Sequence, residues 1–327
     1  MLSIVPCNDD SLWNAFLEKE KKKQWVTIAH NPCLGKILSK TFGYGYQNYV
    51  VMDGERVVGM LPTSEVGGKL VSMPHFSYGG PIISEEVLDN GVVDLKSLLG
   101  DRKFEVRSFS KLSPHFTDKK ISCILDLKNS EDEMIMTIQS KLRQKIRKCL
   151  KIGYLVKTGH AELLDDFYDV FTKRMLKFGS PPLGKVFFKN ILENYQYGDV
   201  QITVIYDGVK VISAGFSISY LGFNELCWSS TDDDYNKYNV NAMLFWEMIK
   251  TSIAKGHHYY SFGRSTVDSP QHFFKKLWNP IEVPIYYNLS EQPSGSIRDF
   301  EFLTKIWKYQ PLKTSQILGH VVSKYIY

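Results

Sequence analysis

Two segments nearly half a chain apart carry the same pattern, and this repeat limits the possible folds more than any other feature. Apolar residues flank Asp53-Gly54 and again Asp207-Gly208, 154 residues apart (207 − 53) in a chain of 327. An Asp-Gly pair between apolar runs is the strongest short signal for a β-hairpin. The repeat predicts two halves built on one plan, although Asp-Gly hairpins are common enough to recur by chance.

The order of elements is clearest in the second half. Apolar periodicity predicts helices at 162–178, 185–194 and 240–255 and strands at 201–206, 209–220, 224–230 and 258–262. An antiparallel meander, then a helix and another strand, is the layer pattern of the acetyltransferase fold. We therefore expect an α/β (α+β) protein with two tandem acetyltransferase (GNAT)-like domains, each a mixed, largely antiparallel sheet flanked by helices.

A helix with clear end signals lies between the two halves. Ser130 is the expected N-cap, Glu133 completes a capping box, and Gly153 marks the end. We expect this single helix to open the second domain. The predicted domains are 1–128, 129–290 with the acyl-transfer site, and a helical extension at 291–327.

The extension contains a predicted turn at 292–295 and two short amphipathic stretches at 300–308 and 315–325. These stretches either pack on the body of the protein or touch a membrane surface. Packing is the reading that we favour.

Composition excludes several classes of protein. Hydrophobic residues make up 43% and charged residues 23%, the balance of a soluble globular protein. No signal peptide is evident and no apolar run approaches the roughly 20 residues of a spanning helix, so we expect a cytoplasmic protein. The five cysteines are scattered without metal-ligand spacing, which predicts free thiols and no metal site.

The net charge of +5 is modest, but basic residues cluster at 141–151. Arg143 and Arg147 are four residues apart and share one helix face. Two guanidinium groups on one face suit a phosphate or diphosphate. A solvated face whose cations complement the helix dipole is the alternative.

The helix predicted at 240–255 begins after a polar stretch in which Asn239 or Asn241 could cap it. In an acetyltransferase fold, the N-terminus of this helix receives the pyrophosphate of coenzyme A. The Gly-rich loop that usually shapes that site is replaced by residues 238–242. The sequence therefore does not support coenzyme A binding in the usual manner.

Lys275 lies in an aromatic-rich turn that follows Arg264 at the end of a predicted strand. A lysine held among aromatic rings could stabilise the oxyanion of an acyl-transfer intermediate, and Arg264 could hold an anionic part of a substrate. A surface lysine beside core aromatics is the alternative. No GxSxG elbow occurs, and the eight histidines have no evident partners. Direct attack by a substrate amine suits a site without a nucleophile.

Several segments, in order, resemble the FemAB-like family, and within it the branch associated with PEP-CTERM/exosortase and exopolysaccharide systems. The resemblance rests on residues 71–81, which look like the family's Ser-x-Pro-Phe-x-x-Tyr-Gly-Gly signature. It also rests on the basic helix at 141–148 and on residues 174–181, which look like its Met-to-Gly-Thr-Pro segment. It continues through 235–246, 262–265 and 274–278.

The resemblance implies acyl or aminoacyl transfer onto an amine of a cell-envelope, peptidoglycan or exopolysaccharide precursor. By matching motif, Phe274 and Lys275 correspond to the pair assigned to transition-state stabilisation, and Arg143 to an acceptor-phosphate ligand. The full set of expected site residues is Lys275, Phe274 and Arg264 for catalysis and Arg143, Arg147, Tyr78, Trp228, Tyr235, Asn239 and Trp278 for substrate binding.

Two features depart from the family. The coiled-coil arm of the classical Fem ligases has no counterpart, because no sustained heptad segment occurs. Ser261 replaces an Asp that this branch often has before Phe262, Gly263 and Arg264. The role of proton acceptor would then pass to the substrate or to a nearby carboxylate, with Asp232, Asp233, Asp234 and Asp268 as the candidates.

The donor stays open between acyl-CoA and aminoacyl-tRNA, neither held tightly as a cofactor. The expected partners are an envelope or polysaccharide precursor, tRNA, and the inner face of a membrane through the extension. The alternatives are an acetyl-CoA-dependent N-acetyltransferase of small amines and a non-catalytic module that binds RNA or an anionic glycolipid.

Overall fold

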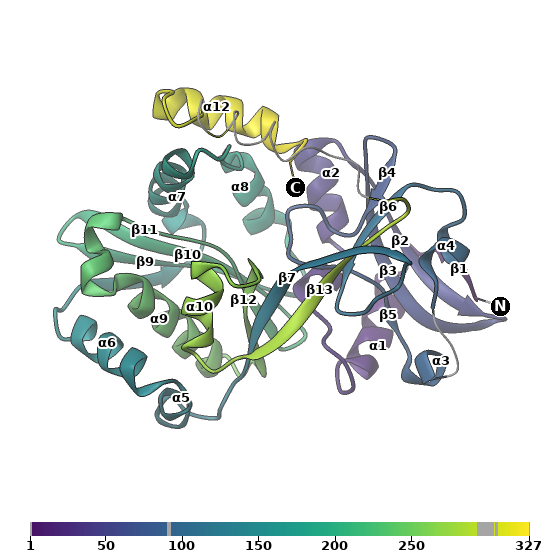
Figure 1. Cartoon of the computed structure of the whole chain (residues 1–327), viewed down its shortest axis with the longest axis horizontal. Helices are drawn as coiled ribbons and strands as arrows, with labels where there is room; N and C mark the ends of the chain where they lie inside the picture. Colours follow the sequence, from purple (N-terminus) through teal and green to yellow (C-terminus); the bar gives the residue numbers. More distant parts are fainter. Residues whose placement is uncertain (1, 90–92, 293–303, 305–306, 327) are drawn as a thin grey trace.

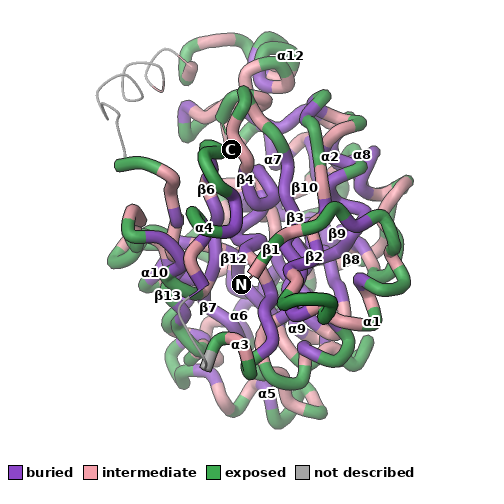
Figure 2. The backbone as a smooth tube through the Cα atoms, turned by 90° about the vertical axis from the view of Figure 1, so that its right-hand side faces the viewer, coloured by how far each residue is buried: buried purple, intermediate pink, exposed green. Residues whose placement is uncertain are grey.

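The computed structural model of the protein describes residues 2–89, 93–292, 304 and 307–326. Within them, thirteen strands form one sheet in the order β1-β2-β3-β4-β6-β13-β7-β12-β11-β10-β9-β8, with β5 paired to β3. The strands are β1 Leu2–Pro6, β2 Gly45–Asp53, β3 Arg56–Val66, β4 Lys69–Val71, β5 Ile82–Ile83, β6 Phe104–Ser108, β7 His115–Asp126, β8 Leu155–Gly159, β9 Gly198–Asp207, β10 Lys210–Tyr220, β11 Phe223–Thr231, β12 Tyr259–Thr266 and β13 Ile281–Leu289. Much of this sheet is buried (Figure 2).

Both predicted hairpins are present. Asp53 pairs with Arg56 across β2 and β3, and Asp207 pairs with Lys210 across β9 and β10. The glycine that follows each aspartate has a φ of 58°, which glycine adopts without steric cost. The same two-residue turn therefore occurs at the corresponding place in each half, as a tandem architecture requires.

Helices cover both faces of the sheet. They are α1 Asp10–Glu20, η1 Ile28–His30, α2 Leu34–Phe42, α3 Glu85–Asp89, α4 Leu95–Leu99, α5 Glu131–Thr137, α6 Ser140–Leu150, η2 Ala161–Leu163, α7 Leu164–Phe178, α8 Lys185–Asn194, η3 Asp233–Tyr238, α9 Val240–Ala254, α10 Pro270–Lys276 and α12 Leu312–Ser323. In the second half, α7 and α8 lie on one side of the sheet, and α9 with α6 lies on the other (Figure 1). The helices predicted at 162–178, 185–194 and 240–255 are confirmed as η2 with α7, α8 and α9.

The two halves share strands. β7 pairs with β12 on one side and with β13 on the other. β13 is the last strand that the structure describes, and it also pairs with β6 of the first half. The sheet therefore runs without a break across the predicted boundary at residue 128.

The prediction of one helix from Ser130 to Gly153 was wrong, because the segment forms two helices, α5 and α6. Ser130 does cap α5, since its hydroxyl accepts a hydrogen bond from the Glu133 amide. The chain is extended at Ile138 and Gln139. The Gln139 amide donates to the Leu277 carbonyl over 3.1 Å, so a contact with a distant segment replaces a helical hydrogen bond.

The turn predicted around Phe274 and Lys275 is also a helix, α10. Ser269 caps it by accepting from the His272 amide, and Pro270 stands at its first position. Proline is favourable at the first helical position because its missing N–H would have no partner there. Both Phe274 and Lys275 are therefore held by a helix rather than by a turn.

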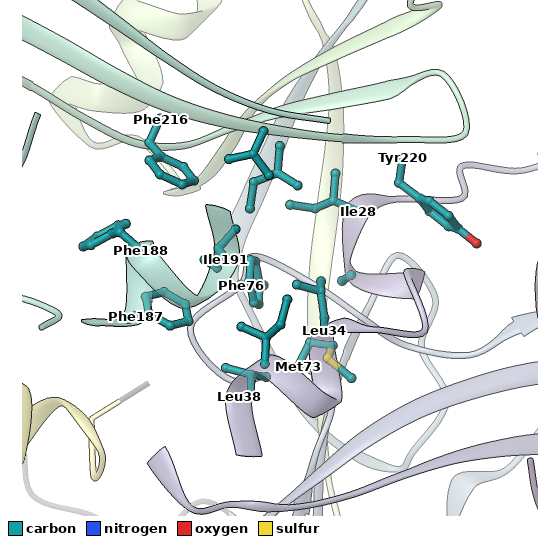
Figure 3. Close-up of a cluster of buried hydrophobic side chains, with 14 of the residues drawn as sticks. Ile28, Leu34, Leu38, Met73, Phe76, Phe187, Phe188, Ile191, Phe216 and Tyr220 are labelled. Atoms are coloured by element: carbon teal, nitrogen blue, oxygen red, sulfur yellow. The ribbon is translucent and has the colours of Figure 1, made fainter. Parts of the chain in front are cut away.

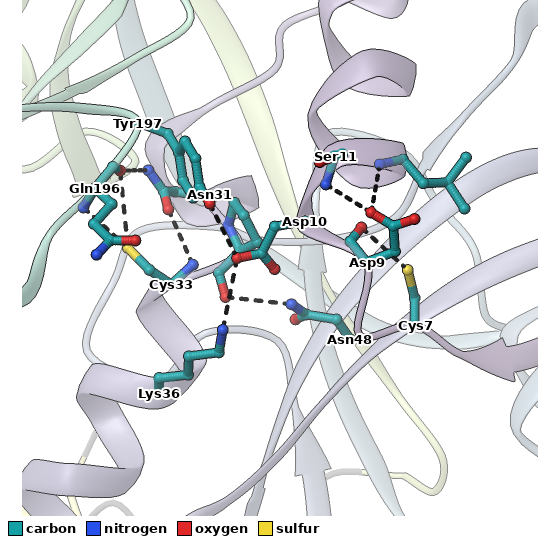
Figure 4. Close-up of polar contacts among 12 residues, drawn as sticks. Cys7, Asp9, Asp10, Ser11, Asn31, Cys33, Lys36, Asn48, Gln196 and Tyr197 are labelled. Carbon is teal, nitrogen blue, oxygen red and sulfur yellow. Dashed lines mark hydrogen bonds and ion pairs between the residues drawn. The ribbon is translucent and has the colours of Figure 1, made fainter.

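Side chains from both halves meet in one apolar core. Figure 3 shows residues of the first half packed against residues of the second half: Leu34, Leu38, Met73 and Phe76 with Phe187, Phe188, Ile191 and Phe216. Polar contacts join the halves as well (Figure 4). The Asn31 side chain donates to the Gln196 carbonyl over 2.7 Å, and Tyr197 donates to Asp10 over 3.3 Å. The halves therefore act as one packed body.

The C-terminal stretch predicted at 315–325 is confirmed as a helix, α12, which packs on α7. The predicted turn at 292–295 and the stretch at 300–308 lie largely outside the described residues. No helix in the described part of the chain combines the length and apolarity needed to cross a bilayer.

Candidate active site

The parallel strands β11 and β12 separate near the centre of the sheet. They pair only where Phe223, Asn224 and Glu225 face 259–261, yet both strands continue several residues further. A cavity of about 670 Å³ opens between them. It is lined by both diverging strands, by the start of α9 at Asn241, and by α10. We call it the β11–β12 cavity.

Lys275 lines this cavity although it is only 8% exposed. Its Nζ donates to the carbonyl oxygens of Gly263 and Arg264 over 3.1 and 3.2 Å. Burial lowers the pKa of Lys275 to about 8, so most of it carries a proton at neutral pH. Gly263 has a φ of 66°, and a Cβ there would lie 3.2 Å from the Leu226 carbonyl. The lysine is therefore held by a backbone bend that favours glycine.

Further cations lie around the same cavity. Arg264 lines it and donates through Nη1 to the Tyr287 hydroxyl over 2.8 Å. The Arg107 guanidinium lies 5.0 Å from the centre of the Tyr287 ring. Lys120 also lines the cavity, and burial, with the charges of Arg264 and Arg107, lowers its pKa. This concentration of positive charge suits a substrate with an anionic group.

Glu225 is a buried carboxylate at the point where β11 and β12 separate. It faces Ser261 across the two strands and is 1% exposed. Its Oε1 accepts a 2.6 Å hydrogen bond from Ser77, whose oxygen accepts from the Arg264 amide over 3.2 Å. Oε2 has no hydrogen-bond partner among the described residues. Burial raises the pKa of Glu225 to about 7, against a smaller opposing effect of its hydrogen bonds and of Lys275.

Residues 138–276, which include α9, α10 and both diverging strands, match the family model described as Acetyltransferase (GNAT) domain. FemX matches over 88% of this chain and 97% of its own length, with a TM-score of 0.62 and 13% identity. The chain shares the tandem GNAT fold of FemX. The fold class and the family resemblance expected from the sequence are thereby confirmed.

Other solved structures share this tandem GNAT fold. A tandem GNAT protein from the clavulanic acid biosynthesis pathway matches over 90% of this chain and 100% of its own, with a TM-score of 0.52 and 12% identity. The C-terminal domain of a putative lysylphosphatidylglycerol synthetase from Agrobacterium fabrum matches over 88% and 92%, with a TM-score of 0.50 and 11% identity. At these identities the likeness is one of fold. No curated protein matches the sequence.

Within this fold, the three residues expected to act in catalysis lie together. Phe274, Lys275 and Arg264 all line the β11–β12 cavity. Phe274 packs edge-on against Phe245 of α9, with ring centres 5.5 Å apart, so the wall beside Lys275 is apolar. An apolar wall strengthens the field of a charge that faces it.

Tyr78 is a buried link between the halves. Its hydroxyl donates to Ser261 over 2.8 Å, and Ser261 accepts from the Gly263 amide over 3.0 Å. Ser261 therefore orients the loop that holds Lys275. The ring of Tyr78 faces a second cavity of about 450 Å³, lined also by residues 21–25, 79–82 and 108–110.

The carboxylates named as candidate bases lie outside the lining of the β11–β12 cavity. Asp232 pairs with Lys210 over 2.8 Å, and Asp233 pairs with both Arg174 and Lys177. These ion pairs lower the pKa of both aspartates, which makes them weak proton acceptors. Asp234 and Asp268 are exposed. Glu225 was missed, although a glutamate inside a predicted apolar strand was a usable signal.

Of the two tryptophans expected to bind substrate, Trp278 is a core residue and Trp228 is partly buried and packs against the core. Trp228 lies 5.2 to 5.9 Å, ring centre to ring centre, from Phe76, Phe187, Phe188 and Phe216. Trp278 is fully buried beside Phe245 and Phe262. Neither tryptophan is among the described residues that line the β11–β12 cavity.

The remaining expected residues surround α9. Asn239 begins α9 with a φ of 62° and makes no side-chain cap. Tyr235 donates to Asp207 over 2.9 Å, outside the cavity lining. Arg143 donates through Nη1 to the Met136 carbonyl oxygen near the end of α5 over 3.4 Å. Arg147 is exposed. The structure does not bring the two arginines of α6 to the cavity lining that it describes.

Proposed function

We propose that this chain is an acyltransferase that transfers an acyl or aminoacyl group onto an amine of a cell-envelope, peptidoglycan or exopolysaccharide precursor. We place it in the cytoplasm, in contact with the inner face of a membrane. The observation that carries the proposal is a buried lysine, Lys275, set opposite a free strand edge in the β11–β12 cavity.

The free edge of β11 favours acyl-CoA as the donor. Beyond Glu225, β11 has no ladder partner on the β12 side, while it still pairs with β10 on its other side. Unpaired backbone groups in a cavity can bind the amides of an extended ligand, in the manner of an added strand. Asn241 of α9 also lines the cavity, so the positive end of that helix faces the same space. These features could hold a thioester despite the missing Gly-rich loop.

Lys275 has one N–H left for the reaction. An ammonium group has three donors, and two are used by the carbonyls of Gly263 and Arg264. The third can point into the cavity and bind the oxyanion that forms when the amine attacks the acyl carbon. Because the two carbonyl contacts hold Nζ in place, this stabilisation needs little rearrangement.

Glu225 is the proton acceptor that we assign. It is not among the described lining residues, but Ser77 connects it to the backbone of Arg264, which does line the cavity. The attacking nitrogen forms the new C–N bond and loses a proton, which passes to Glu225 directly or through Ser77, its hydrogen-bond partner. The C–S bond of the thioester breaks, and the departing thiolate takes a proton. A carboxyl with a pKa of about 7 can accept and return a proton at neutral pH.

The cations around the cavity favour an acceptor that carries negative charge. Arg264 and Lys120 both line it. A phosphate or carboxylate on an envelope precursor fits that field. The fold neighbour named as a putative lysylphosphatidylglycerol synthetase suggests a lipid with an anionic head group as one such acceptor.

Aminoacyl-tRNA is the second candidate donor, and the basic helix α6 favours it. Lys141, Arg147, Lys148 and Lys151 are all exposed there, which gives a cationic surface suited to RNA. Strong salt dependence of RNA binding without turnover of any donor would point to a binding module instead.

Transfer assays with matched variants test the proposal. Purified protein is given acyl-CoA thioesters or charged tRNAs with amine-bearing envelope precursors, and adduct masses are followed. Lys275→Met keeps the length of the side chain but removes its charge. Lys276→Met removes the charge of the exposed neighbour on α10.

We expect transfer from acyl-CoA that Lys275→Met lowers by about a hundredfold or more and Lys276→Met leaves within about twofold. Transfer from charged tRNA but not from acyl-CoA would show that aminoacyl-tRNA is the donor. Equal activity in wild type and Lys275→Met would refute the role of this lysine, and no turnover with a broad panel would refute the enzyme.

A further inference from the structure

The C-terminal helix α12 docks on the protein through its smallest residues. Ser315, Gly319 and Ser323 are its buried residues, and they recur every four positions on one face. A Cβ at Gly319 would lie 2.5 Å from Cδ of Pro182. The Gln316 side chain donates to Thr172 of α7 over 3.0 Å. The helix is therefore held closely by three small residues, with the half-buried Leu312 and Val322 on the same side.

The opposite face of α12 is apolar and open to solvent. Ile317 and Val321 of the helix are 70% and 59% exposed, and Tyr325, in the turn directly after the helix, continues the four-residue spacing and is 72% exposed. Leu318 lies beside them and is 45% exposed. A surface helix of a water-soluble protein normally turns its apolar stripe inward. Here the stripe faces outward, so its apolar residues do not serve the core.

The charge around this stripe has one sign. Residues 307–326 contain Lys308, Lys313 and Lys324 and no aspartate or glutamate. Lys308 and Lys313 are exposed. Tyr309, at 90% exposure, lies just before the helix. Tyrosines beside an apolar stripe with flanking lysines are typical of helices that lie in the interface of an anionic membrane.

We propose that the outward face of α12, formed by Ile317, Leu318, Val321 and Tyr325 with the flanking lysines, binds the surface of an anionic lipid membrane. The helix lies flat in the head-group region, since its 12 residues are too few to span a bilayer. The protein body stays attached through the small-residue face. The apolar residues enter the lipid, and the lysines meet lipid phosphates.

This docking would bring the β11–β12 cavity close to the lipid. α12 packs on α7, and α7 also supplies Arg174 and Phe178 to the cavity lining. A lipid-linked acceptor would then reach Lys275 without leaving the membrane. This last step rests on the proposed function, whereas the docking itself does not.

Vesicle co-sedimentation of the full chain tests the docking. One set of vesicles is phosphatidylcholine alone, and the other contains phosphatidylglycerol as about one third of the lipid. Ile317→Ser with Val321→Ser removes the apolar stripe, and Lys308→Gln with Lys313→Gln removes two charges. The controls are Val209→Ser, fully exposed in a hairpin turn, and Lys96→Gln on α4.

We expect the wild type to bind anionic vesicles at least about tenfold more tightly than neutral ones, and less tightly as salt rises. The affinity of the stripe variant for anionic vesicles should fall about tenfold or more. The lysine variant should lose mainly the salt-dependent part of its affinity, and both controls should bind like wild type. Binding that the stripe variant retains, or no vesicle binding at low salt, would overturn the proposal. Loss of a dimer in the stripe variant without vesicle binding would assign the face to a second copy instead.

Transfer between a soluble donor and a soluble amine separates the two proposals. The stripe variant should keep wild-type turnover in that assay and a wild-type circular dichroism melting curve. Vesicle binding without turnover would leave the docking standing and remove the proposed function.

Discussion

Ser77 of the first half donates a 2.6 Å hydrogen bond to the Glu225 carboxylate of the second half, 148 residues further along the chain. The same serine oxygen accepts from the Arg264 amide, next to the carbonyls that hold Lys275. The candidate base and the candidate oxyanion group are thus positioned by one hydroxyl. We infer that neither half contains a complete site, because Ser77, in the 71–81 motif of the first half, supports the strands that carry the chemistry.

The pH profile of turnover should be narrow and bell-shaped. Glu225 must be deprotonated to accept a proton, so the rate should rise with a pKa of about 7, and Lys275 must be protonated, so the rate should fall with a pKa of about 8. kcat/KM is measured from pH 5.5 to about 9.5 with an acceptor amine that stays unprotonated throughout.

Glu225→Gln should remove the acid limb of that profile and lower turnover about a hundredfold or more. Glu20→Gln is the control, because Glu20 is equally buried but accepts its hydrogen bond from Gln24 of the first half. A glutamine variant that keeps the acid limb would show that the substrate or another group accepts the proton.

Stability should depend on pH through Glu225. Its pKa is near 4.5 in the unfolded chain and about 7 in the folded chain. Between these values the folded chain holds a proton that the unfolded chain has released. The free energy of unfolding therefore falls as pH rises, by about 3 kcal/mol in all. Urea unfolding at pH 5 and pH 8 should show this loss in wild type and a smaller one in Glu225→Gln. Equal losses in both proteins would contradict the assignment.

Trp228 should matter for folding rather than for substrate binding. Its ring packs against four phenylalanine rings, so Trp228→Ala should cost about 3 kcal/mol in the free energy of unfolding. Trp228→Phe keeps an aromatic ring and should leave KM for both substrates within about twofold. A large rise in KM for Trp228→Phe, at unchanged thermal stability, would return this residue to the substrate site.

Arg147 provides the test of the phosphate-binding role predicted for α6. It is exposed and lies outside the described lining of the cavity, so Arg147→Gln should leave the melting temperature unchanged and KM for a phosphate-bearing acceptor within about twofold, whereas a phosphate-binding role would raise KM about tenfold. Arg56→Gln, an exposed arginine of the first half paired with Glu86, is the control. An unchanged KM would favour the solvated-face interpretation of α6.

Local patterns were sufficient for much of the fold. The Asp-Gly hairpins, α7, α8 and α9 depend on turn chemistry and apolar periodicity within a few residues, and these signals act before the chain folds. The aromatic setting of Lys275 was also local, and the structure shows that lysine lining a cavity. The family resemblance rests on the same short motifs in order.

Long-range contacts decided the rest. The helix expected after Ser130 breaks because Gln139 bonds to Leu277, and no local signal marks that partner. Composition cannot say which aromatic rings pack in or against the core, so Trp278 and Trp228 were assigned to substrate.

Glu225 is the clearest case of the difference between sequence and structure. Its position inside an apolar strand could be read from the sequence, but its raised pKa comes from burial between the two halves, and the hydrogen bond from Ser77 of the other half opposes that rise. For α12, the periodic apolar stripe was visible in the sequence, whereas its outward direction depends on how closely Gly319 approaches Pro182. The sequence by itself determined the elements and the reactive side chains, because those depend on neighbouring residues. Only the tertiary structure decided which side chains meet and which faces remain open, because packing between distant segments sets both.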